Sequence, residues 1–271
     1  MQHTPYIRPA AVAGAFYPAQ TAVLSNDVAT LLAQAGHGSS HLPGKAPKAI
    51  IVPHAGYIYS GSTAALAFAQ LASARGQIAR VVLLGPVHRV PVRGLALPDA
   101  EAFETPLGRI EIDAQAVAAI CHLPQVVTSR AAHAHEHSLE VQLPFLQSVL
   151  GHFKLLPLAV GDASAGEVAQ VLDSVWGGPE TLLVISSDLS HFLPYRTALS
   201  VDGETLRQIM HLNPTLSHNQ ACGGTPINGL LLAARAHHLQ AELLGMCNSG
   251  DTAGDKNRVV GYGAVAFQER A

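Results

Sequence analysis

Short aliphatic runs that end at turn-forming residues limit the fold of this chain more than any other feature. They are rich in Val, Ile and Leu, without the polar alternation of a half-exposed strand, which indicates strands buried on both faces. We expect such strands at residues 49–52, 80–84, 155–160, 182–185 and 259–267.

Segments with helical spacing of apolar residues separate these runs. They cover residues 22–35, 61–74, 114–120, 138–150, 165–176, 201–210 and 226–238. Alternating strands and helices predict an α/β fold with a mainly parallel central sheet flanked by helices. The closing segment, 258–267, follows a Gly-rich loop, and we expect it to be an antiparallel strand at the sheet edge. No linker interrupts the sequence, so we expect a single domain over residues 1–271.

Composition narrows the class of protein. With 48% hydrophobic and 13% charged residues, the chain should form a large core, yet no apolar run reaches the roughly 18 residues of a membrane span. The N-terminus lacks the basic and apolar segments of a secretory signal, so we expect a cytoplasmic protein. The 16 Lys and Arg residues are scattered and the net charge is -3, which argues against nucleic acid or a membrane as partner. A small-molecule or peptide ligand is expected, and the sequence leaves the oligomeric state open.

Histidines follow three of the predicted strands directly. His54 comes after the first, His88 after the second, and Asp188 and His191 after a later one. Because the carboxyl ends of parallel strands meet at one edge, these side chains should converge. The alternative for any single histidine is a buried imidazole bound to a backbone carbonyl.

Cys222 precedes a predicted helix in which Thr225 is the expected N-cap and Pro226 the first residue. A thiol at a helix N-terminus is favoured as the thiolate, the form that binds metals or attacks electrophiles. The alternative is an inert, half-buried cysteine. The three cysteines, which include Cys121 and Cys247, show no disulfide pattern.

The segment 133–144 is the densest group of polar residues, but it lacks the HExxH spacing of zinc proteases. His137 and Glu140 are three residues apart and could face the same crevice. For His133 and His135 we favour a solvated helix entry. The later loop 248–258, which contains Asp251, is either a plain connection or a rim over the pocket.

Eight short motifs spread over nearly the whole chain resemble the Memo family, called AmmeMemoRadiSam system protein B in prokaryotes. The motifs are Arg8-Pro9 with residues 13–18, 53–57, 85–88, 104–108, 136–140, 186–191, 222–227 and 248–251. The resemblance implies a fold similar to class III extradiol ring-cleaving dioxygenases, which hold a non-heme Fe(II) with two His and one carboxylate.

The same resemblance implies His54 and His88 as metal ligands, with Cys222 where the dioxygenases have a carboxylate. It also implies His191 as the acid/base residue, oriented or tuned by Asp188. We expect His137 in the catalytic group, and Tyr57, Glu140 and Asp251 at the substrate. His191 in place of Cys222 as the third ligand stays an open alternative.

The expected activity is that of a non-heme iron oxidoreductase, similar to a dioxygenase. Fe(II) is the expected cofactor, with copper or zinc as alternatives for a softer His/Cys site. Two other functions remain open. One is a metal-dependent hydrolase, and the other is a non-catalytic protein that handles metal or redox equivalents or binds a peptide.

Overall fold

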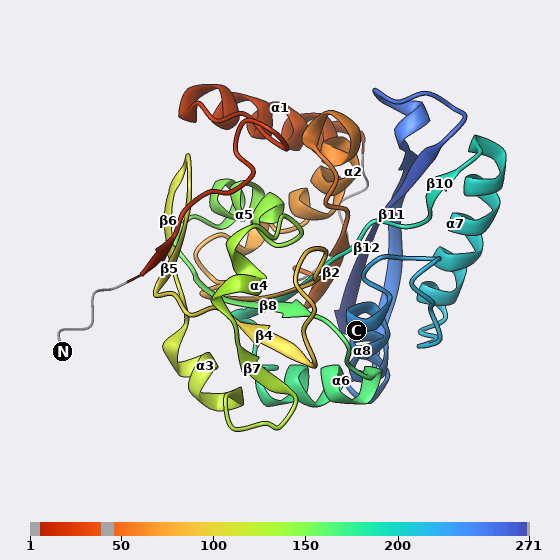
Figure 1. The fold of residues 1–271 in the computed structure, drawn as a ribbon. Coiled ribbons are helices and arrows are strands. Elements are labelled where there is room, and N and C mark those ends of the chain that lie inside the picture. The colour runs from red at the N-terminus through yellow and green to blue at the C-terminus, as the bar shows by residue number, and fades with distance from the viewer. Residues whose placement is uncertain (1–5, 39–45, 270–271) are drawn as a thin grey trace.

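A mixed β-sheet forms the centre of the computed structural model, which describes residues 6–38 and 46–269 (Figure 1). Four neighbouring strands are parallel: β2 (Ala49–Val52), β9 (Thr181–Ser186), β3 (Arg80–Pro86) and β8 (Lys154–Val160). Beyond β8 lie β4 (Leu95–Leu97), which is antiparallel to it, and β7 (Val126–Thr128). Beyond β2 lies the antiparallel β12 (Val259–Glu269), which also pairs with β10 (His191–Leu193) and β11 (Leu239–Asn248). The predicted parallel centre is confirmed, and the outer strands make the sheet mixed.

Helices cover both faces of this sheet. Alternate side chains of β2 enter different cores: Ile50 and Val52 pack in one, Ala49 and Ile51 in the other. The first core includes α1 (Thr21–Gly38), α2 (Tyr57–Ala69) and α5 (Leu143–Leu150), and the second includes α3 (Ala114–Ile120), α6 (Ala165–Ser174) and α8 (Gly224–Ala236). The continuous apolar runs of the sequence are therefore explained by burial on both sides.

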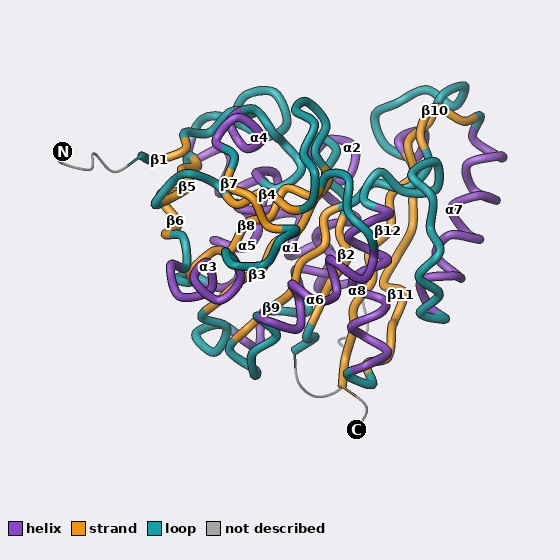
Figure 2. The backbone as a smooth tube through the Cα atoms, turned by 60° about the horizontal axis from the view of Figure 1, so that its bottom comes forward, coloured by secondary structure: helices purple, strands orange, loops and turns teal. Residues whose placement is uncertain are grey.

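The remaining elements lie around this body. A small sheet contains β1 (Ile7–Arg8), β5 (Ala102–Thr105) and β6 (Gly108–Glu111). Figure 2 shows the long strands β11 and β12 side by side, with α7 (Tyr195–Met210) outside them. Short helical segments are α4 (Arg130–Ala134), η1 (Ala72–Ala74), η2 (Glu140–Gln142) and η3 (Ser249–Asp251). Among the described residues, no helix combines the length and apolar character needed to cross a membrane.

Two local predictions are wrong, one strand was not predicted, and one helix begins later than expected. The closing strand β12 is antiparallel as expected, but β11 pairs along its outer side, so β12 is not at the edge. β11 escaped prediction because most of its side chains are exposed or half-buried, which leaves no apolar run. Helix α8 begins at Gly224 with Gly223 as its N-cap, so Thr225 is not the cap. The segment predicted as a helix over 138–150 is helical as η2 followed by α5 from Leu143.

The topology brings three loops to one edge of the sheet. The loops that follow β2, β3 and β9 leave from carboxyl ends of neighbouring parallel strands. They carry His54, His88 and Asp188 respectively. The edge predicted to hold the site is thus the edge at which these residues lie.

Candidate metal centre

His54 is held by a hydrogen bond at Nδ1, and its Nε2 contacts the Cys222 thiol. Its side chain is 2% exposed, and Nδ1 lies 2.9 Å from Ser186 Oγ. The Ser186 hydroxyl donates its proton to the carbonyl oxygen of Ser138, at 2.6 Å, so Oγ has to accept from His54. Gln142 Nε2 donates to the same Oγ. His54 therefore carries its proton on Nδ1 and has a lone pair on Nε2, the form that binds a metal.

His88 is oriented in a similar way by a carboxylate. Its Nδ1 lies 2.8 Å from Glu136 Oε1, and its backbone N–H donates to Oε2 at 2.7 Å. Burial acts to raise the pKa of Glu136, but hydrogen bonds from His88 and from the Ser138 amide outweigh it and lower that pKa to about 2. The ionised carboxylate accepts the Nδ1 proton, which leaves Nε2 of His88 as a ligand atom.

Cys222 completes the group. Its Sγ lies 3.4 Å from His54 Nε2, and the ligand atoms of His54, His88 and Cys222 all lie within 4.8 Å of one another. With a metal–nitrogen bond of about 2.0 Å and a metal–sulfur bond of about 2.3 Å, two ligands at a tetrahedral angle lie roughly 3.5 Å apart. The spacing and the free lone pairs therefore fit a transition metal.

The thiol itself differs from the prediction. Burial, and then the charge of Asp188, raise the pKa of Cys222 to about 12. The expected stabilisation of a thiolate by the helix is therefore wrong for the metal-free chain, because desolvation dominates. A bound cation reverses this balance, since a coordinating thiol loses its proton.

Gly223 has to be glycine, because its Cβ would lie 2.7 Å from the Cβ of Ser187.

His137 lies beside both histidine ligands. Its ring centroid is 4.5 Å from that of His88 and 5.3 Å from that of His54. Burial, and then the charge of His88, lower the pKa of His137, which favours its neutral form. His88, Glu136 and His137 form a second group with metal-ligand spacing. The first group fits a metal better, because Glu136 Oε1 already accepts from His88, His137 and Ser138.

Among the described residues, no hydrogen bond or ion pair joins Asp188 to His191, so Asp188 does not orient this ring directly, and its tuning of His191 stays a prediction. His191 Nδ1 lies 2.9 Å from the carbonyl oxygen of Leu189, so the ring donates to the backbone. Asp188 Oδ1 accepts from the His54 amide at 2.7 Å, and Oδ2 lies 4.0 Å from His54 Nε2. Burial raises the pKa of Asp188. Leu189 directly follows Asp188 and its carbonyl bonds the ring, while the Asp188 carboxylate bonds the His54 amide, a choice that spacing in the sequence could not show.

The three predicted substrate contacts bond to other parts of the chain. Tyr57 donates to the carbonyl oxygen of Val141, and Asp251 accepts from Tyr195 at 2.5 Å. Glu140 is completely buried and accepts hydrogen bonds from Arg8, Ala11, Val12 and Tyr17. The structure does not link any of these three side chains to the histidine cluster by a direct contact. Their roles as substrate contacts stay predictions.

Sequence reasoning missed the residues that orient the ligands. Glu136 and Ser186 stood in motifs, and Gln142 in the polar segment 133–144, without an assigned role. All three are buried. Glu136 and Ser186 bond histidines that are far away along the chain, and Gln142 bonds Ser186. The available sign of an orienting residue in the sequence was the position of Glu136, a carboxylate directly before His137.

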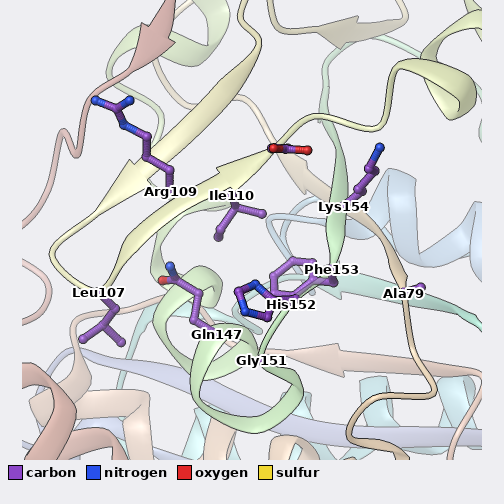
Figure 3. A pocket seen from close by; sticks show the side chains of 10 residues that line it. Ala79, Leu107, Arg109, Ile110, Gln147, Gly151, His152, Phe153 and Lys154 are labelled. Carbon is purple, nitrogen blue, oxygen red and sulfur yellow. The ribbon is translucent and has the colours of Figure 1, made fainter.

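A cavity of about 580 Å³ lies away from this cluster (Figure 3). Its lining residues include Arg109 and Ile110 of β6, Gln147 of α5, and Lys154 at the start of β8. Ala79, which also lines it, directly precedes β3, so the cavity lies near the amino ends of these strands. Donor chemistry, and not cavity size, identifies the histidine cluster as the candidate site.

Replacing Glu136 by Gln should lower metal affinity about 10- to 100-fold, because the carboxylate that orients His88 and increases its basicity is lost. Competition with a chelator of known affinity measures this change. The matched control is Glu101→Gln, at an exposed acidic residue outside the cluster. Equal affinities of Glu136→Gln and wild type would show that the carboxylate does not support a metal ligand.

Comparisons with known proteins agree with the motifs. The profile of the family described as "Memo-like protein" matches residues 8–266. A MEMO1 family protein of Aquifex aeolicus is 36% identical, over 96% of this chain and 99% of the relative. Another from Ignicoccus hospitalis is 34% identical, over 96% and 98%. Among solved structures, an uncharacterized protein JW3007 from Escherichia coli K12 is similar at a TM-score of 0.49 and 15% identity, over 80% of this chain and 98% of that one. The family match and the near full-length relatives show that this chain belongs to the Memo family.

Proposed function

We propose that the chain binds one divalent transition metal ion through His54, His88 and Cys222 and acts as a non-heme iron oxidoreductase on a small-molecule or peptide ligand. One observation carries the metal proposal. Two histidines are each held by their Nδ1 proton, and the thiol lies 3.4 Å from the free nitrogen of His54. Both rings donate through Nδ1 to fixed acceptors, which leaves the two Nε2 lone pairs within reach of one ion.

When bound, the metal supplies Lewis acidity and, if it is iron, electron transfer toward dioxygen. The chain supplies the rest. Ser186 and Glu136 fix the two imidazoles, so little reorganisation accompanies metal binding. His137, with its lowered pKa, stands beside the ligands as a neutral hydrogen-bonding group. Nδ1 of His191 bonds the Leu189 carbonyl oxygen, which leaves Nε2 without that bond. We assign the proton transfer to this Nε2.

We propose Fe(II) because the family resembles the iron-dependent extradiol dioxygenases, and copper and zinc are the alternatives. Two imidazoles suit all three metals, and a thiolate shifts preference toward softer ones. The same cysteine supports a second candidate function, in which the protein handles metal or redox equivalents without turnover. That candidate predicts stoichiometric metal and no consumption of oxygen.

Oxygen uptake separates the two candidates. Protein loaded with Fe(II) under anaerobic conditions is mixed with catechol and then with oxygenated buffer. Uptake above that of the His54→Ala, His88→Ala double variant supports the oxidoreductase. Metal binding without uptake on catechol or its substituted forms favours metal handling.

His191→Ala should abolish that uptake and leave metal content unchanged, because His191 bonds to the Leu189 carbonyl and is not in the ligand group. Elemental analysis and the oxygen electrode measure the two effects on the same sample. His211→Ala, at an exposed histidine after α7 whose Nδ1 bonds the carbonyl oxygen of Arg207, is the matched control. If His191→Ala loses as much metal as His54→Ala, His191 is a metal ligand and Cys222 is not needed as the third one.

A further inference from the structure

The turn that carries His191 is fixed by a strand on one side. Gly261 of β12 donates its N–H to the carbonyl oxygen of Ser190 at 2.9 Å and accepts from the Leu189 amide at 2.8 Å. Leu189 is also the residue whose carbonyl oxygen accepts from His191 Nδ1. The backbone bonds of this turn therefore determine where the imidazole lies.

A carboxylate from α7 holds the same turn. Asp202 is 1% exposed, and its Oδ1 accepts from the Ser190 amide at 2.9 Å. Burying a carboxylate costs free energy unless hydrogen bonds or a cation compensate for the lost water. The hydrogen bond from the Ser190 amide is therefore an important contact of Asp202. Gly261 makes room for it, because a Cβ on Gly261 would lie 1.9 Å from Asp202 Oδ2.

The electrostatic surroundings connect this carboxylate with His191. Burial raises the pKa of Asp202, while the Ser190 hydrogen bonds and then the charge of His191 lower it. The charge of His191 also acts on Asp188 and on His54. On the other side, His191 pairs with Val260 of β12, which carries no charge. Asp202 is thus a second buried carboxylate whose pKa responds to the charge of His191, and it lies on a different element, α7.

We propose that Asp202 is a positioning residue for His191: by holding the Ser190 amide against Gly261, it fixes the imidazole with Nδ1 bonded to Leu189 and Nε2 free. Only the use of that free nitrogen in proton transfer rests on the proposed function. The positioning itself needs neither a metal nor a substrate.

Nitrogen-15 NMR of histidine-labelled, metal-free protein tests this assignment, with the His191 signals identified from a His191→Gln variant. In wild type we expect a single Nδ1–H form of His191. Asp202→Ala and Gly261→Ala should both lose it and show a mixture of the two tautomers, since one removes the acceptor and the other displaces it. Gly203→Ala is the control on α7, because a Cβ there meets nothing within 4 Å.

Asp202→Asn keeps an acceptor for the Ser190 amide and should retain the single form, which guards against a variant that simply fails to fold. A purely structural role for Asp202 lowers the melting temperature of Asp202→Ala but leaves the His191 tautomer unchanged, and that result overturns the proposal. It is also overturned if Asp202→Asn behaves like Asp202→Ala. Because no turnover is measured, an inactive protein would refute the proposed function alone.

Discussion

Replacing His54 and His88 together by alanine should abolish stoichiometric metal binding. Each side chain supplies one Nε2 lone pair, and Cys222 by itself is a buried thiol whose pKa is raised to about 12. Without the imidazoles and the cation, the hydrogen bonds around that thiol do not offset the cost of ionising it. Elemental analysis of protein purified after anaerobic loading should fall from about one metal per chain to background.

The control is a double variant at His122 and His135, two exposed histidines outside the cluster. It removes the same number of imidazoles and should keep full occupancy. Equal metal content in wild type and the His54→Ala, His88→Ala variant would end the metal proposal. Retention of half the metal would point to a second site that uses neither His54 nor His88.

The strands that could be predicted are those whose own side chains are apolar enough to mark them as buried. Residues 49–52 are apolar throughout, and the observed β2 has the same bounds. Helices cover both faces of β2, so every residue of the strand is buried and has to be apolar. β11 could not be predicted in the same way. Its exposed Leu243 and Met246 and its break in register after Leu243 arise from pairing with β12, which the segment itself does not encode.

In the candidate site, too, the proposed ligands could be predicted from the sequence, but the groups that set their protonation could not. His54 and His88 directly follow strands, so their convergence is a consequence of parallel topology. The groups that set their protonation, Glu136 and Ser186, act across 48 and 132 residues of sequence respectively. The state of the Cys222 thiol was predicted from the helix end alone, whereas its burial, which sequence does not give, dominates.

Replacing Arg8 by Met should lower the free energy of unfolding by about 3 to 5 kcal/mol, because it leaves a buried carboxylate without its cation. Arg8 and Glu140 have side chains 2% and 0% exposed and form an ion pair. Glu140 keeps its hydrogen bonds from the Ala11 and Val12 amides and from Tyr17, so it has to stay buried after the change. For a chain of this size the loss corresponds to roughly 10 °C in melting temperature, which calorimetry measures.

Arg109→Met is the matched control. Arg109 pairs with Glu104 at 3.2 Å, but their side chains are 62% and 44% exposed, so its loss should cost less than about 1 kcal/mol. Arg8 also donates to the carbonyl oxygens of His133 and Glu136, at 2.8 and 2.7 Å. Because the Glu136 carboxylate orients His88, Arg8→Met should weaken metal binding as well as stability, whereas Arg109→Met should change neither. Equal melting temperatures for the two variants would show that Arg8 and Glu140 do not act as a buried ion pair.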